Sequence, residues 1–78
     1  MVVGTVTGAI WATRKAPCFQ GQTLLVVDTL RGSVVAADHV GAGVGDKVLL
    51  ITGSAAARFS MESPTDAVIV AIIDPQGK

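Results

Sequence analysis

Three short apolar runs separated by two turns make up residues 23–52, TLLVVDTLRGSVVAADHVGAGVGDKVLLIT. These runs are rich in β-branched residues, whose side chains suit the pleated surface of a sheet. The expected strands cover residues 23–30, 34–38 and 47–52. Residues 31–33 predict a tight turn that joins the first two strands as a hairpin, and the glycines of residues 41–46 predict a second turn. The stretch therefore predicts a β-rich domain.

The flanking segments extend this pattern towards both ends of the chain. Residues 2–14 predict one long strand, in which Gly4 and Gly8 mark a bend or a close approach of the backbone. The other expected elements are a loop over 15–22, a helical turn over 54–58 with Ser54 as its N-cap, a loop over 59–65 and a last strand over 66–74. Five short strands with one brief helix are typical of a small closed barrel or sandwich, and we predict a single all-β domain over residues 1–78.

The composition indicates that this domain does not stand alone. Half of the 78 residues are hydrophobic and 15% are charged, against about 25% charged in ordinary soluble domains. Continuous apolar runs occupy residues 24–27, 48–51 and 68–73. A strand with one face in water should alternate apolar and polar residues instead. We therefore expect another subunit to cover the second face of these strands.

Charge and cysteine content exclude several classes of protein. Six basic residues balance six acidic ones, whereas a free-standing nucleic-acid binder usually carries a basic excess. The single cysteine, Cys18, excludes an internal disulfide framework. No apolar run approaches the ~20 residues of a membrane span, and the N-terminal residues lack the basic and apolar regions of a signal peptide. We expect no membrane and no nucleic-acid partner.

The glycines of residues 41–45, GAGVG, resemble part of a dinucleotide-binding loop. In such a loop a helix follows the glycines, so that its N-terminus faces the pyrophosphate. Here the residues that follow, 47–51, predict a strand. We therefore interpret this segment as a structural turn, and we expect no cofactor.

The side chains that could carry chemistry are few. Cys18 and His39 would act as nucleophile and base only if the fold joined them to a third, orienting group, and together they are too few for a closed zinc site. Ser54 lacks the G-x-S-x-G pattern of a hydrolase nucleophile. Asp46 and Asp66 lie beside turns, where solvated or backbone-capping roles are expected. We predict no catalytic residue and no metal site.

Short motifs follow one another along nearly the whole chain. They are V-x-G at 6–8, A-T-x-K at 12–15, G-x-x-L-L-V-V at 21–27, V-A-x-D-x-V-G-A-G-x-G-D-x-V-L at 35–49, G-S-x-A-x-R at 53–58 and D-A-x-I-V-x-I-I-D at 66–74. The ordered set resembles the EutN/CcmL family of bacterial microcompartment vertex proteins. This resemblance implies a five-stranded barrel of OB-like topology that assembles as a cyclic pentamer.

The resemblance also implies a structural function. The pentamer would cap the vertices of a polyhedral shell whose facets are hexamers of another protein family, inside the bacterial cytoplasm. Gly53, Ser54, Ala56 and Arg58 correspond to the region near the five-fold axis, where they would line or support a narrow pore. The residues expected at subunit contacts are Trp11, Val40, Gly41, Ala42 and Gly43.

Two other functions are open on the residues alone. One is an OB-like module that binds single-stranded nucleic acid or a ligand. The balanced charge and the scarcity of aromatic residues disfavour it, because such modules combine basic side chains with stacking aromatics. The other is a small enzyme built at a subunit interface around Cys18 or His39. Leu25 and Ile69 are expected in the core, and a substitution of Gly43 is expected to harm the fold if that glycine has a positive φ.

Overall fold

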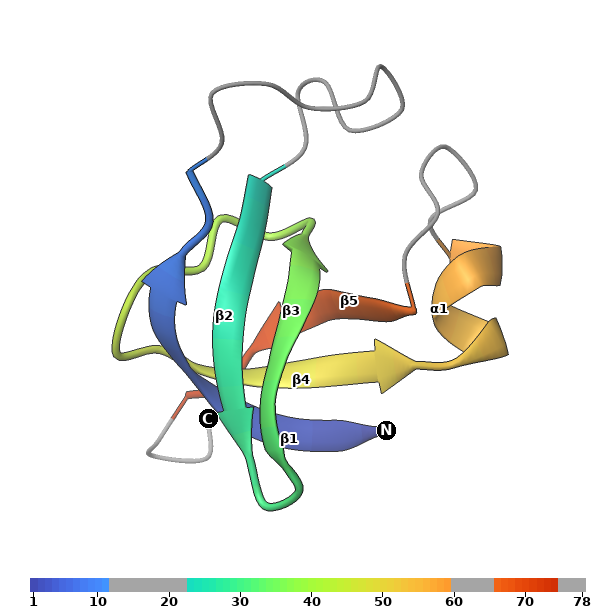
Figure 1. The fold of residues 1–78 in the computed structure, drawn as a ribbon, viewed down its shortest axis with the longest axis horizontal. Helices are drawn as coiled ribbons and strands as arrows, with labels where there is room; N and C mark the ends of the chain where they lie inside the picture. Colours follow the sequence, from blue (N-terminus) through green and yellow to red (C-terminus); the bar gives the residue numbers. More distant parts are fainter. Residues whose placement is uncertain (12–22, 60–65, 75–78) are drawn as a thin grey trace.

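The computed structural model describes residues 1–11, 23–59 and 66–74, with the backbone alone for residues 57–59. In this part of the chain the elements are β1 (Val2–Ala9), β2 (Thr23–Thr29), β3 (Gly32–Asp38), β4 (Lys47–Thr52), α1 (Ser54–Phe59) and β5 (Ala67–Ile72). Figure 1 shows the strands wrapped around one another, with α1 at one side, beyond the end of β4. The predicted hairpin, the fourth strand and the short helix are therefore confirmed. The predicted loop over 15–22 lies outside the described residues, and of the loop predicted over 59–65 the first residue belongs to α1 while residues 60–65 lie outside the described residues.

The strands close into a barrel in the order β1-β2-β3-β5-β4. All neighbouring pairs are antiparallel except β3 and β5, which pair in parallel over Ala37↔Val68 and Asp38↔Ile69. β1 completes the barrel because its first half pairs with β4 and its second half with β2, with Thr5 in both registers. This arrangement confirms the expected small five-stranded barrel with one short helix.

The two glycines of β1 are present for different structural reasons. A Cβ atom built on Gly4 would lie 2.5 Å from Val27 Cγ1 and 2.6 Å from the carbonyl oxygen of Asp28, so the backbones of β1 and β2 approach closely there. Gly8 has open space at the same position and lies beside a register shift between Val6 and Gly8, as at a β-bulge. The predicted bend and close approach are both present, at separate residues.

The interior of the barrel is filled by aliphatic side chains from all five described strands. The largest fully buried ones are Leu50, Ile69, Val6, Val27, Val48 and Val68. Leu25 is 4% exposed and Ile69 is 0% exposed, which confirms the two predicted core positions. These side chains form the apolar core that stabilises the barrel.

The outer surface of the same strands is also apolar. Buried Leu25 and Val27 alternate with partly exposed Leu24 and Val26 in β2. The partly or fully exposed apolar residues on the other two strands are Leu49 and Ile51 of β4, and Val70, Ala71 and Ile72 of β5. The continuous apolar runs therefore give β2 and β4 one face in the core and one partly exposed apolar face, whereas β5 begins with three buried residues and its exposed apolar residues follow them.

Three local expectations need correction. The first strand ends at Ala9 rather than at residue 14, although the Ile10 amide still donates to the Leu24 carbonyl at 2.9 Å. Helix α1 begins at Ser54, so the capping position belongs to Gly53, whose carbonyl accepts a hydrogen bond from the Ala56 amide. Among the described glycines, those with positive φ are Gly32, Gly41, Gly45 and Gly53. Gly43 is not among them, so the expectation that its substitution harms the fold, which depended on a positive φ, does not apply.

Candidate functional site

Of the two side chains considered as nucleophile and base, one lies within the described part of the chain. His39 is exposed directly after β3, and Cys18 lies outside the described residues. Within residues 1–11, 23–59 and 66–74, no group of three or more His, Cys, Asp and Glu residues could hold a metal ion. None of the helices described is both long enough and apolar enough to span a bilayer.

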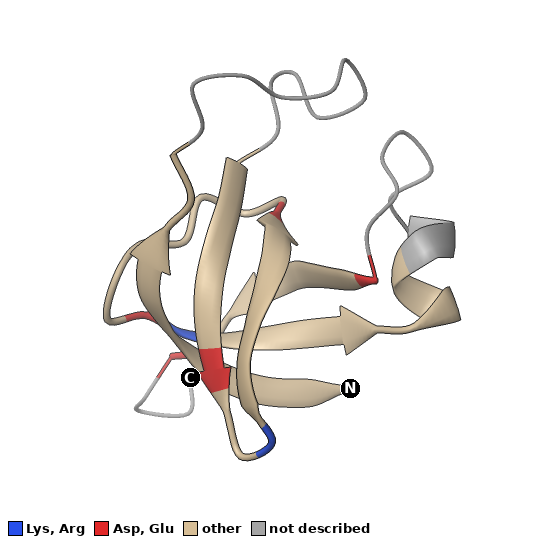
Figure 2. Ribbon diagram, viewed as in Figure 1, with Lys and Arg blue, Asp and Glu red and all other residues tan. Residues whose placement is uncertain are grey.

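Charged side chains are dispersed over the barrel. Figure 2 shows blue at the start of β4 and at the β2–β3 hairpin, with red segments at several other places along the described ribbon. A single-strand binder would instead present a basic groove with aromatic side chains along it. The distribution of charge does not favour nucleic-acid binding by the described surface.

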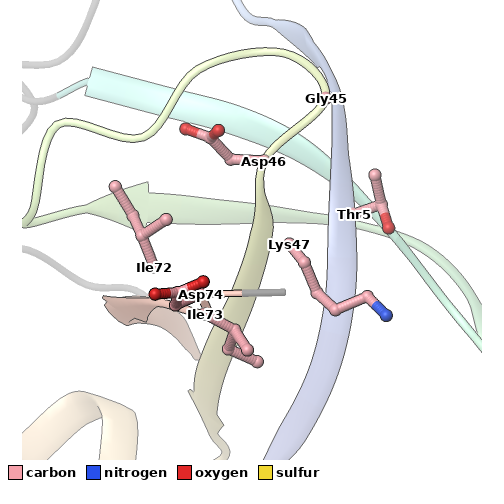
Figure 3. A pocket seen from close by; sticks show the side chains of 7 residues that line it. All are labelled: Thr5, Gly45, Asp46, Lys47, Ile72, Ile73 and Asp74. Carbon is pink, nitrogen blue, oxygen red and sulfur yellow. The ribbon is translucent and has the colours of Figure 1, made fainter. Parts of the chain in front are cut away.

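An open cleft lies beside the start of β4. Its walls are formed by Thr5, Gly45, Asp46, Lys47, Ile72, Ile73 and Asp74. Figure 3 shows the Lys47 side chain extending towards Thr5 rather than towards the carboxylates of Asp46 and Asp74. The sequence did not point to this cleft, because its walls come from three segments far apart in the chain.

Exposed apolar side chains gather at opposite ends of β3. At the β2–β3 hairpin, Leu30 is fully exposed next to Met1 and Val3, and the three share an open cleft of about 420 Å³ with Val2, Arg31 and Thr52. We call Met1, Val3 and Leu30 the hairpin patch. Beyond the other end of β3, Val40 is 40% exposed and Val44 is 70% exposed. Trp11, Val35 in the middle of β3 and Ile72 are exposed as well, so the isolated barrel leaves apolar surface in water at both ends of β3 and beyond them.

The segment between β3 and β4, residues 39–45, is held by two carboxylates. The Asp38 carboxylate accepts hydrogen bonds from the amides of Val40 (3.1 Å) and Ala42 (3.0 Å). Asp46 Oδ2 accepts one from the Gly43 amide at 2.8 Å. The backbone-capping role expected for Asp46 is confirmed, whereas the double acceptor role of Asp38 was not predicted. We call residues 39–45 the clamped loop.

The subunit-contact residues expected from the sequence lie mostly on this loop. Val40, Gly41 and Gly43 are exposed, and the partly buried Ala42 packs against the barrel core. Trp11 is 91% exposed after the end of β1. The structure brings four of the five residues together in one short segment and places Trp11 on another.

The expected axial residues lie around the start of α1. The Gly53 amide donates to the Asp66 carbonyl at 2.8 Å, which ties the start of the helix to the residue before β5. Gly53 and Ser54 are exposed, whereas Ala56 is fully buried. Arg58 belongs to the same helix. In this arrangement Gly53 and Ser54 can line a surface, while Ala56 can only support it from inside the chain.

The sequence of this barrel matches the model of a known family. The model of the family described as ethanolamine utilisation protein EutN/carboxysome matches residues 1–74. The chain belongs to the EutN/CcmL family. This finding confirms the resemblance drawn from the ordered motifs.

Members of the EutN/CcmL family with curated functions are similar over nearly their whole length. The carboxysome shell vertex protein CcmL of Synechococcus elongatus is 42% identical, over 95% of this chain and 84% of the relative. The bacterial microcompartment shell vertex protein PduN of Salmonella typhimurium is 37% identical, over 94% of this chain and 91% of the relative.

Solved structures of the family share the fold. CcmL of Nostoc sp. PCC 7120 superposes with a TM-score of 0.85 at 38% identity, covering 95% of this chain and 89% of that one. The pentameric microcompartment shell protein GrpN of Rhodospirillum rubrum gives a TM-score of 0.83 at 38% identity, covering 95% and 94%. The closed barrel is thus the family fold.

Proposed function

We propose that this chain is a structural protein that forms pentamers at the vertices of a bacterial microcompartment and closes its polyhedral shell. The observation that carries the proposal is the family match over residues 1–74, with relatives that are shell vertex proteins and a structural neighbour that is pentameric. The apolar outer residues of β2, β4 and β5 favour association, because contact with neighbouring subunits removes them from water.

A five-fold ring suits both the shell and this barrel. A flat hexagonal layer cannot close into a polyhedron, and five-fold units provide the curvature that it lacks. In a ring each subunit contacts its two neighbours through two different surfaces. The described barrel exposes apolar side chains on the hairpin patch and on the clamped loop, and also at Trp11, Val35 and Ile72.

Two groups of residues have separate places in the proposed ring. Trp11 and the segment Val40, Gly41, Ala42 and Gly43 contribute to subunit contacts. Gly53 and Ser54 lie towards the five-fold axis, with Ala56 and Arg58 of the same helix supporting that surface. The ring contacts hexameric facet proteins of the shell in the bacterial cytoplasm, and it carries out no catalysis.

Native mass spectrometry of the purified chain tests the ring directly. The expected result is a discrete species at five times the 7.9 kDa chain mass. A monomer or dimer as the main species across the accessible concentration range would defeat the proposal. Steep, salt-dependent binding to single-stranded nucleic acid by such a species would favour the OB-like binding module instead.

A further inference from the structure

The clamped loop is held by several hydrogen bonds in spite of its glycine content. Both carboxylate oxygens of Asp38 are occupied by amides two and four residues further along, and Asp46 holds the Gly43 amide from the other side. The Gly45 amide donates to the Val6 carbonyl at 2.8 Å, and the Val6 amide donates to the Asp46 carbonyl at 2.9 Å. The loop is therefore fastened to β1 and to the ends of β3 and β4.

These hydrogen bonds determine which apolar side chains of the clamped loop face the core and which face solvent. Ala42 packs against the core, and Val40 and Val44 remain exposed on either side of it. A positive φ at Gly41 (79°) allows the chain to turn between Val40 and Ala42, and a positive φ at Gly45 (94°) allows it to turn after Val44. The hydrogen bonds of the backbone thus keep the Val40 and Val44 side chains exposed to solvent.

We propose that Asp38 and Asp46 are positioning residues for assembly, which hold the clamped loop in the shape that a second copy of this chain binds. Ordering a flexible backbone on association costs conformational entropy. A loop that is already ordered avoids much of that loss, so the contact is tighter. The inference rests on the proposed pentamer.

A second copy is the occupant because the loop surface is uncharged and the chain itself offers the apolar counterpart. Residues 40–45, VGAGVG, carry no charged side chain. A ring contact joins two different surfaces of identical subunits, and another exposed apolar surface, the hairpin patch, lies at the opposite end of β3. Each copy can therefore present the clamped loop to one neighbour and an apolar surface to the other.

The test compares Asp38→Ala and Asp38→Asn with the control Asp28→Ala. Asp28 is an exposed aspartate, whereas Asp38 is partly buried, and Asp28 accepts a hydrogen bond from Ser33 Oγ in the β2–β3 hairpin, away from the loop. Labelled and unlabelled rings of each protein are mixed, and subunit exchange is followed by native mass spectrometry. Hydrogen exchange of the Val40 and Ala42 amides is measured on the same samples.

Rings of Asp38→Ala are expected to exchange subunits about tenfold faster than wild-type rings. Within each subunit the substitution removes two hydrogen bonds from loop amides to a charged acceptor. Asp38→Asn should lie between the two, because its single amide oxygen retains acceptor capacity for part of the clamp. Asp28→Ala should exchange within about twofold of the wild type. The Val40 and Ala42 amides should lose protection in Asp38→Ala, while β2 and β3 amides keep it.

Two outcomes would overturn the inference while leaving the pentamer intact. One is wild-type exchange in Asp38→Ala despite deprotected loop amides, which would mean that loop order does not matter for assembly. The other is equal acceleration by Asp28→Ala, which would point to a general effect of charge. A wild-type chain that never forms rings would instead overturn the proposed function, and this inference with it.

Discussion

Replacing Gly4 by alanine should disrupt the barrel at the point where β1 passes closest to β2. The new Cβ atom would lie 2.6 Å from the Asp28 carbonyl oxygen and 2.5 Å from Val27 Cγ1, where ordinary contacts begin at 3.4 Å. The Val27 side chain is fully buried and has little room to rotate away. The Asp28 backbone is paired with Thr5 of β1 on one side and with Ser33 of β3 on the other. Relief therefore requires a strand to move by about 0.8 Å.

Such overpacking destabilises a protein by about 1–3 kcal/mol. We expect the upper part of this range, because the obstacle includes backbone held in two strand pairs. In a domain of this size each kcal/mol lowers the melting temperature by about 4–8 °C. The melting temperature of Gly4→Ala should therefore fall by roughly 10–20 °C.

Gly8→Ala is the matched control in the same strand. A Cβ atom there meets nothing within 4 Å, and Gly8 is not among the glycines with positive φ. Alanine should restrict the unfolded chain and leave stability unchanged or raised by about 0.4–1 kcal/mol. Thermal unfolding is followed by circular dichroism at equal protomer concentration, because the stability of an oligomer depends on concentration. If Gly4→Ala and Gly8→Ala melted within about 2 °C of each other, the close approach would not constrain the barrel.

Three further predictions follow from burial, backbone and exposure. Ile69→Asp should yield no soluble folded protein, because a carboxylate would be buried in the core without a partner. The exposed-site control Leu30→Asp should stay folded by far-UV circular dichroism, and a folded Ile69→Asp would contradict the core assignment. Gly45→Ala should lose about 1–2 kcal/mol in urea unfolding, since its φ is 94°, and Gly43→Ala should lose less; equal losses would refute the backbone argument. Trp11, the single tryptophan, is exposed in the isolated chain, so its fluorescence should shift to shorter wavelength as rings form, and an unchanged spectrum would remove it from the contact.

The candidate site was predictable in part. The glycine-rich segment was recognisable as a turn, and its residues were assigned to a subunit contact from the family resemblance. The hydrogen bonds that hold it were not, because Asp38 and Asp46 are short polar residues of the kind that occurs in any turn. Their acceptor roles depend on where the Val40, Ala42 and Gly43 amides point.

The amino-acid sequence by itself determined the elements, the apolarity of both strand faces and the family. Side-chain type and glycine position act over a few residues, so apolar runs such as 24–27 and 48–51 already specify strands with no polar face. Only the tertiary structure decided how the strands close. Thr5 pairs with both β2 and β4, and Gly4 lies against Asp28, through contacts between residues far apart in the chain. Local patterns do not encode such contacts, because register and closure follow from the packing of the whole barrel at once.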